Sequence, residues 1–198
     1  MTPEQQACKK QFEMQPILDP CCGSRMMWFD KADQRCLFGD MRDECHSLKD
    51  RQYQRHLKIH PDVRLDFRRL PFADGTFKLV VFDPPHLVRV GKKSWLALKY
   101  GRLGDDWRDD LSKGFSECFR VLENGGVLIF KWNEDQIKVP EILALTPEKP
   151  LFGHPTGRHG RTHWFTFLKG WDMTGMSEHK AINKAIQETI PETQEKAV

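Results

Sequence analysis

The chain has 198 residues, of which 39% are hydrophobic and 30% charged, a composition that fits one globular domain with a core of its own. Its formal net charge of +3 is too small by itself to indicate a polyanionic partner. No run approaches the roughly 18 apolar residues of a membrane span, nor the apolar core of a signal peptide, so we expect a cytoplasmic protein without membrane contact. The six cysteines contain no C-x-x-C pair, which predicts reduced thiols and no metal site.

The first half of the chain predicts short strands that alternate with turns and polar segments. An N-terminal helix or arm is expected within residues 1–15, and the polar segment 42–60 is expected to be a surface excursion. Strands are expected at 16–19, 36–40, 63–66 and 77–82.

The second half contains the clearest helical pattern. Apolar residues from Leu111 to Leu122 follow helical spacing and predict a helix over 110–122, which Asn124, Gly125 and Gly126 should end. Further strands are expected at 127–132, around 151–152 and at 163–168. We therefore expect one domain over 1–170 and a polar tail over 171–198.

Acidic residues follow four of the expected strands, at Asp19, Asp40, Asp66 and Asp83. Aspartate is common in the turn after a strand, but four such cases in succession weaken that explanation. Because the carboxyl ends of parallel strands meet at one edge of a sheet, and ligands bind there, the pattern predicts an α/β fold with a binding edge.

The most informative motif is Asp83-Pro84-Pro85-His86, directly after the strand at 77–82. Proline has no N–H and ends the ladder, so the Asp83 carboxylate and the Pro84 carbonyl are expected to face a crevice without partners. Two acceptors side by side are suited to the two N–H groups of a planar amine.

Two basic segments without acidic residues follow this motif in the sequence, and we expect them to flank the proposed site. The loop at 87–110 is acid-free up to Gly104, and a second such stretch surrounds 154–164. Ordinary solvated loops are one explanation; contact with a nucleic-acid backbone and an unstacked base is the other, and we favour it. The expected substrate-binding residues are Arg89, Lys92, Lys93, Trp95, Lys131, Arg158 and Arg161.

With these residues the chain, over about 17–169, resembles the class I S-adenosylmethionine-dependent methyltransferases, in particular the amino-methylating group marked by Asp/Asn-Pro-Pro-aromatic. It is also similar to small methyltransferases encoded on phages and prophages. The resemblance implies a Rossmann-like fold with a mostly parallel, twisted sheet and an antiparallel C-terminal strand.

The resemblance also implies a set of cofactor contacts. The turn after the first strand would cradle the methionine part of S-adenosylmethionine, Asp40 would accept hydrogen bonds from the ribose hydroxyls, and Asp66 with Phe67 would hold the adenine. The residues assigned to the turn are Asp19, Pro20, Cys21 and Gly23. The short distance from Gly23 to Leu37 predicts a truncated first helix.

The catalytic residues that the resemblance implies are Asp83, Pro84, Pro85 and His86. The family usually has a large aromatic residue where this chain has His86, which would stack on the base, hydrogen-bond to it, or accept a proton with an ordinary pKa of about 6.5. The expected reaction is methylation of adenine N6 in DNA. Methylation of adenine N6 or guanine N2 in RNA, and a non-catalytic protein that binds nucleic acid or a partner, are the alternatives.

Overall fold

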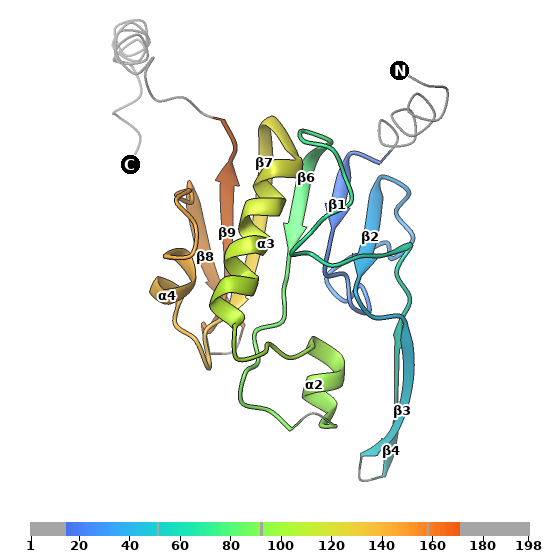
Figure 1. The fold of residues 1–198 in the computed structure, drawn as a ribbon. Coiled ribbons are helices and arrows are strands. Elements are labelled where there is room, and N and C mark those ends of the chain that lie inside the picture. The colour runs from blue at the N-terminus through green and yellow to red at the C-terminus, as the bar shows by residue number, and fades with distance from the viewer. Residues whose placement is uncertain (1–14, 51, 92, 158, 171–198) are drawn as a thin grey trace, which may run out of the picture.

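The computed structural model describes residues 15–50, 52–91, 93–157 and 159–170 (Figure 1). Its seven-stranded sheet has the order β5-β2-β1-β6-β7-β9-β8. The strands are β1 (Ile17–Asp19), β2 (Cys36–Asp40), β5 (Val63–Arg64), β6 (Phe77–Phe82), β7 (Leu122–Asn133), β8 (Phe152–Thr156) and β9 (Thr162–Leu168).

In this order, each of the strands β5, β2, β1, β6 and β7 is parallel to its neighbours among them. By contrast, β9 is antiparallel to β7, and β8 is antiparallel to β9. The prediction of an α/β fold with a mostly parallel sheet and an antiparallel C-terminal strand is therefore confirmed. The order of the strands reverses between β1 and β6, which is where a sheet of this kind opens a crevice at its carboxyl edge.

One helix, α3 (Trp107–Val121), lies along β6 and β7 (Figure 1). Its apolar stripe brings Phe115 to 5.6 Å from Phe82 and 4.8 Å from Phe130, measured between ring centroids. Gly114 permits this approach, because a Cβ there would lie 2.8 Å from ring atoms of Phe67 and Phe82. The helix thus packs on Phe82, the last residue of β6, directly before Asp83.

The helix predicted over 110–122 begins three residues earlier, at Trp107, and the strand predicted over 127–132 begins five residues earlier, at Leu122. Gly125 and Gly126 do not form a free turn, because both pair with the main chain of Lys169 at 2.8 and 2.9 Å. This pairing extends β7 back to Leu122, with a shift of register against β6 between Phe77 and Leu79.

The segment 42–60, which we predicted to be a surface excursion, contains a hairpin of β3 (Glu44–Asp50) and β4 (Tyr53–Ile59) that was not predicted. It extends beyond the carboxyl edge of the sheet (Figure 1). Leu57 and Ile59 are buried on one side of β4 while His56 and Lys58 are exposed on the other. Too few apolar residues follow this alternation for the sequence to have indicated it.

Two helices were not predicted because they are too short for a hydrophobic stripe: α2 (Trp95–Tyr100) and α4 (Val139–Leu143). α2 lies within the basic loop 87–110, and the Ser94 side chain caps it by accepting from the Ala97 N–H at 3.2 Å. Within the described residues 20–35, turns replace a helix between β1 and β2, in agreement with the predicted truncation.

The helix or arm expected in residues 1–15 lies almost wholly outside the described residues, as does the tail at 171–198. None of the described helices is long and apolar enough to cross a membrane.

Candidate active site

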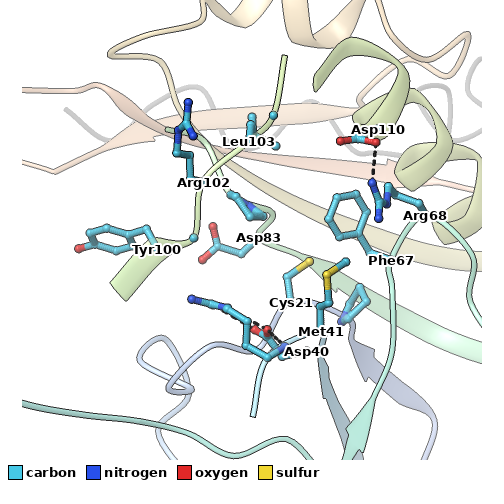
Figure 2. Close-up of a pocket in the computed structure, with 15 residues that line it drawn as sticks. Cys21, Asp40, Met41, Phe67, Arg68, Asp83, Tyr100, Arg102, Leu103 and Asp110 are labelled. Carbon is cyan, nitrogen blue, oxygen red and sulfur yellow. Dashed lines mark hydrogen bonds and ion pairs between the residues drawn. The ribbon is translucent and has the colours of Figure 1, made fainter. Parts of the chain in front are cut away.

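The carboxyl ends of β1, β2 and β6 open into a cavity of about 330 Å³ (Figure 2). A smaller cavity of about 50 Å³ adjoins it. Cys21, Arg42, Asp83 and Tyr100 line both cavities, so Asp83 lies at their junction. We call these the larger and the smaller cavity.

Asp19, the acid at the end of β1, is fully buried and is not part of the lining of either cavity. Its carboxylate accepts hydrogen bonds from the Cys21 N–H at 3.2 Å and from Trp28 Nε1 at 2.8 Å. Burial raises the pKa of Asp19 to about 7. Asp19 therefore holds the turn at 20–24 in place rather than facing a ligand.

The turn at 20–24 is tied to β2 through Gly23, whose N–H donates to Asp40 Oδ2 at 2.9 Å. Gly23 has a φ of +52°, a conformation that other residues rarely adopt. Pro20 lines the larger cavity, Gly23 the smaller, and Cys21 both. Burial raises the pKa of the Cys21 thiol well above its usual range, so the thiol stays protonated at neutral pH.

Asp40, at the end of β2, lines the larger cavity but is already paired with Arg42. The Arg42 N–H donates to Oδ1 at 2.9 Å, and its guanidinium donates to both carboxylate oxygens at 3.1 and 3.3 Å. The same guanidinium donates to the Leu98 carbonyl of α2 at 2.8 Å. Arg42, which the sequence analysis did not single out, thus connects the end of β2 to the helix in the basic loop.

Asp66 and Phe67, which we predicted to hold the adenine together, are placed differently in the structure. Phe67 lines the larger cavity, but Asp66 is turned toward Arg68, which donates to both of its oxygens at 2.7 to 3.0 Å. Arg68 also donates to Asp110, a lining residue that was not predicted. Hydrogen bonds from Arg68 hold the pKa of Asp66 below its usual range.

The register of β6 and β7 places the Asp83 carboxylate. Phe82 pairs with Phe130, so Asp83, which follows Phe82, lies beside Lys131, which follows Phe130. Lys131 Nζ donates to Asp83 Oδ2 at 2.5 Å. Burial raises the pKa of Asp83, and the Lys131 charge opposes that rise. Among the described residues, none donates to Asp83 Oδ1 or to the Pro84 carbonyl.

His86 lies in the smaller cavity between two other rings. Its ring centroid is 5.4 Å from that of Tyr100 and 6.3 Å from that of Trp132. Burial, and then the Lys131 charge, lower the pKa of His86 to about 4. The imidazole is therefore neutral at pH 7.

Of the predicted substrate-binding residues that the structure describes, only Lys131 lines either of these two cavities. The main chain of Arg89 is held by the Gln136 side chain, Arg161 donates to Asp135 at 2.6 Å, and Trp95 has the Arg55 guanidinium 5.4 Å from its ring. Lys93 is exposed in the basic loop, and Lys92 and Arg158 lie outside the described residues. No group of three metal-ligating side chains occurs in the described part of the chain.

The cavity residues that sequence reasoning missed include two arginines that follow a strand-end acid by two positions. Arg42 follows Asp40 and Arg68 follows Asp66, and a third such pair, Asp33 with Arg35, makes the same contacts away from the cavities. The Asp-x-Arg spacing alone did not identify them, because Arg64 and Arg108 follow Asp62 and Asp106 at the same spacing and bind other partners.

No family model and no curated protein matches the sequence. Among solved structures, a TehB-like SAM-dependent methyltransferase from Corynebacterium glutamicum aligns at 12% identity and a TM-score of 0.47, over 77% of this chain and 79% of that one. The PH0226 protein from Pyrococcus horikoshii aligns at 14% identity and 0.46, over 85% and 92%. A geranyl diphosphate methyltransferase in complex with GPP and sinefungin aligns at 12% and 0.44, over 84% and 78%.

Proposed function

We propose that this chain transfers a methyl group from S-adenosylmethionine to an exocyclic amino group of a nucleic-acid base, adenine N6 in DNA in the first place. The observation that carries the proposal is the pair of free acceptors at the junction of the cavities. Asp83 Oδ1 and the Pro84 carbonyl are neighbours in the chain, and no described residue donates to either of them.

The residues of the larger cavity fit S-adenosylmethionine. Met41, Phe67 and Leu103 offer apolar contact for an adenine, and the Asp40 carboxylate lies at the end of β2, where a ribose can be bound. The Asp40 oxygens are shared with Arg42, so the ribose hydroxyls would take acceptor positions that the guanidinium now uses. Pro20, Cys21 and Gly23 would surround the methionine part. When bound, the cofactor supplies an electrophilic methyl group.

The amino group of a base is a poor nucleophile because its lone pair is delocalised into the ring. If its two N–H groups donate to Asp83 Oδ1 and the Pro84 carbonyl, the nitrogen is pyramidalised and its lone pair is directed at the methyl group. The ionised Asp83 also stabilises the positive charge that develops on this nitrogen.

The proton released after transfer needs an acceptor, and Asp83 is better suited to the task than His86. Burial raises the pKa of Asp83, which makes the carboxylate a stronger base, and it would already be hydrogen-bonded to the reacting nitrogen. The pKa of His86 is lowered to about 4, which makes the imidazole a weaker base than usual.

The nucleic-acid part of the proposal rests on the surroundings of the smaller cavity. Lys99 and Lys131 line it, and the basic loop that contains Arg89, Lys93 and Trp95 continues from its rim. Cations next to aromatic rings are suited to a phosphate backbone with an unstacked base. A base within a duplex would have to be flipped out to reach Asp83.

The test is a transfer assay with tritiated S-adenosylmethionine against duplex DNA, single-stranded DNA, transfer RNA and ribosomal RNA, followed by nucleoside analysis. We expect N6-methyl-2′-deoxyadenosine from DNA. If an amino group were methylated in RNA but not in DNA, the proposed substrate would change to RNA and the proposed reaction would stand. Transfer to none of the four would contradict the proposal.

A non-catalytic role is favoured by one observation: Asp40, Asp66 and Asp83 are all paired with a basic side chain. Calorimetric titration with S-adenosylmethionine separates the two functions. Heat of binding is expected from the enzyme, whereas no measurable heat would support the non-catalytic role.

A further inference from the structure

His86 occupies the position where the stacking aromatic residue was expected, but protein rings already surround it. Tyr100 lies tilted against it, and Trp132 lies edge-on at an interplanar angle of 78°. Trp132 itself is 1% exposed and donates to the Ile137 carbonyl at 3.0 Å, so it belongs to the core. Trp132 therefore offers no open ring face to a ligand, whereas His86 is half-buried, lines only the smaller cavity and has both of these rings against it.

Tyr100, the last residue of α2, is placed differently. It is partly exposed and lines both cavities together with Asp83. In Figure 2 its ring lies on the opposite side of Asp83 from Phe67 and Met41, which line only the larger cavity. A ring held at Asp83 from the side of the smaller cavity would therefore meet Tyr100.

The position of Tyr100 is determined by the residue that follows it. Gly101 has a φ of +75°, and a Cβ there would lie 2.8 Å from Pro85 Cγ. Glycine thus lets the end of α2 rest directly on the Asp-Pro-Pro segment. Arg42 also holds this helix by donating to the Leu98 carbonyl at 2.8 Å.

The charge next to Tyr100 indicates what its ring contacts. Lys99 Nζ lies 4.9 Å from the ring centroid and also lines the smaller cavity. Within the described residues, no hydrogen bond is made by the Tyr100 hydroxyl. Among the described residues none forms an ion pair with Lys99, and an aromatic ring next to such a cation is suited to bind an unstacked base and its phosphate.

We infer that Tyr100 is the residue that stacks on the ring bearing the acceptor amine, in place of residue 86, and that it selects planar aromatic acceptors over aliphatic amines. The inference rests on the proposed function, because it assigns the substrate side of the same site. His86 supports the Tyr100 ring from behind and does not itself stack on the base.

The inference is tested with Tyr100→Ala and Tyr100→Phe. The alanine variant should raise the KM for a single-stranded oligodeoxynucleotide by about 5- to 150-fold, because it removes one base-aromatic stack, and should leave the Kd for S-adenosylmethionine within about threefold. The phenylalanine variant keeps the ring and should stay within about threefold of wild type in both quantities. Leu96→Ala, an exposed side chain of the same helix, is the control and should change neither.

A second measurement does not depend on turnover. An oligodeoxyadenylate that contains one 2-aminopurine should lose fluorescence on binding to wild type and to Tyr100→Phe, and keep most of it with Tyr100→Ala. An unchanged KM and unchanged quenching in Tyr100→Ala, with wild type still transferring methyl groups to DNA, would overturn the stacking role alone. Absence of transfer by wild type to any nucleic acid would overturn the proposed function and this inference together.

Discussion

Lys131 on β7 donates to Asp83 at the end of β6 over 2.5 Å, and the two residues are neighbours because the strands are in parallel register at Phe82 and Phe130. The Lys131 ammonium therefore occupies one oxygen of the carboxylate that we assign to the substrate amine. It leaves Oδ1 for the substrate, and its positive charge favours the ionised form of the buried carboxylate against the effect of burial, which raises the Asp83 pKa.

The ion pair predicts how Lys131→Met changes the pH dependence of methyl transfer. Asp83 must be ionised to accept, so the rate falls as the pH falls through its pKa. Burial raises that pKa and Lys131 lowers it, so removal of Lys131 should move the acid limb of the pH–rate profile upward by about one pH unit or more. Lys131→Arg keeps the charge and should restore most of the profile. An acid limb at the wild-type pH in Lys131→Met would exclude this role.

Asp83→Asn should reduce methyl transfer by about 1000-fold or more, because the amide offers one neutral acceptor where the carboxylate offers charge and two oxygens. The calorimetric Kd for S-adenosylmethionine should stay within several-fold. Asp109→Asn changes an exposed carboxylate that pairs with Lys113 and should behave as wild type. Turnover near the wild-type rate in Asp83→Asn would contradict the assignment of the acceptor.

Asp40→Ala should act on the cofactor first and weaken binding of S-adenosylmethionine by about 10- to 100-fold, the loss expected for about two hydrogen bonds to a charged acceptor. Asp33→Ala is a matched control. Asp33 binds Arg35 through the same three contacts that Asp40 makes with Arg42, but it lines neither cavity. If both variants lost the same affinity for S-adenosylmethionine, the loss would come from disruption of an Asp-x-Arg turn and not from removal of a contact with the ribose.

The buried Asp19 predicts a pH-dependent stability. Its pKa in the folded chain is about 7, against an ordinary value of 3.8, so the folded state binds a proton that the unfolded state releases between these values. The contribution of Asp19 to the free energy of unfolding is therefore fully present below about pH 4. It decreases by on the order of 4 kcal/mol as the pH rises to about 7. Urea unfolding of wild type and Asp19→Asn should show a difference that grows in favour of the variant from pH 5 to pH 8. A constant difference would mean that Asp19 does not titrate in this range.

Gly101→Ala should impair the substrate side of the site, because the left-handed φ and the contact with Pro85 both exclude a Cβ. We expect a lower melting temperature and a raised KM for the oligonucleotide, with the affinity for S-adenosylmethionine changed less. In Gly91→Ala, where the Cβ would meet no atom within 4 Å, both quantities should match wild type. Wild-type kinetics in Gly101→Ala would show that the contact between the end of α2 and Pro85 is not needed for binding of the oligonucleotide.

Much of the sheet was predictable, since each strand is a local pattern. β1, β2 and β6 lie within one residue of the predicted bounds, and the apolar stripe from Leu111 to Phe119 located α3. The hairpin of β3 and β4 was missed because too few of its residues alternate between apolar and polar, and α2 and α4 were missed because they are too short for a hydrophobic stripe. α2 is held by Arg42 and Pro85, which come from other parts of the chain.

The sequence alone determined the acids of the carboxyl edge and the Asp83-Pro84 pair, because proline ends a strand for reasons that are local to the chain. Only the tertiary structure decided what these acids face: Asp19 is buried, Asp66 is turned to Arg68, and Asp83 is paired with Lys131. It also placed Tyr100 at the site. The reason is physical, since charge pairing and burial depend on which strands become neighbours, and strand order is not a local property.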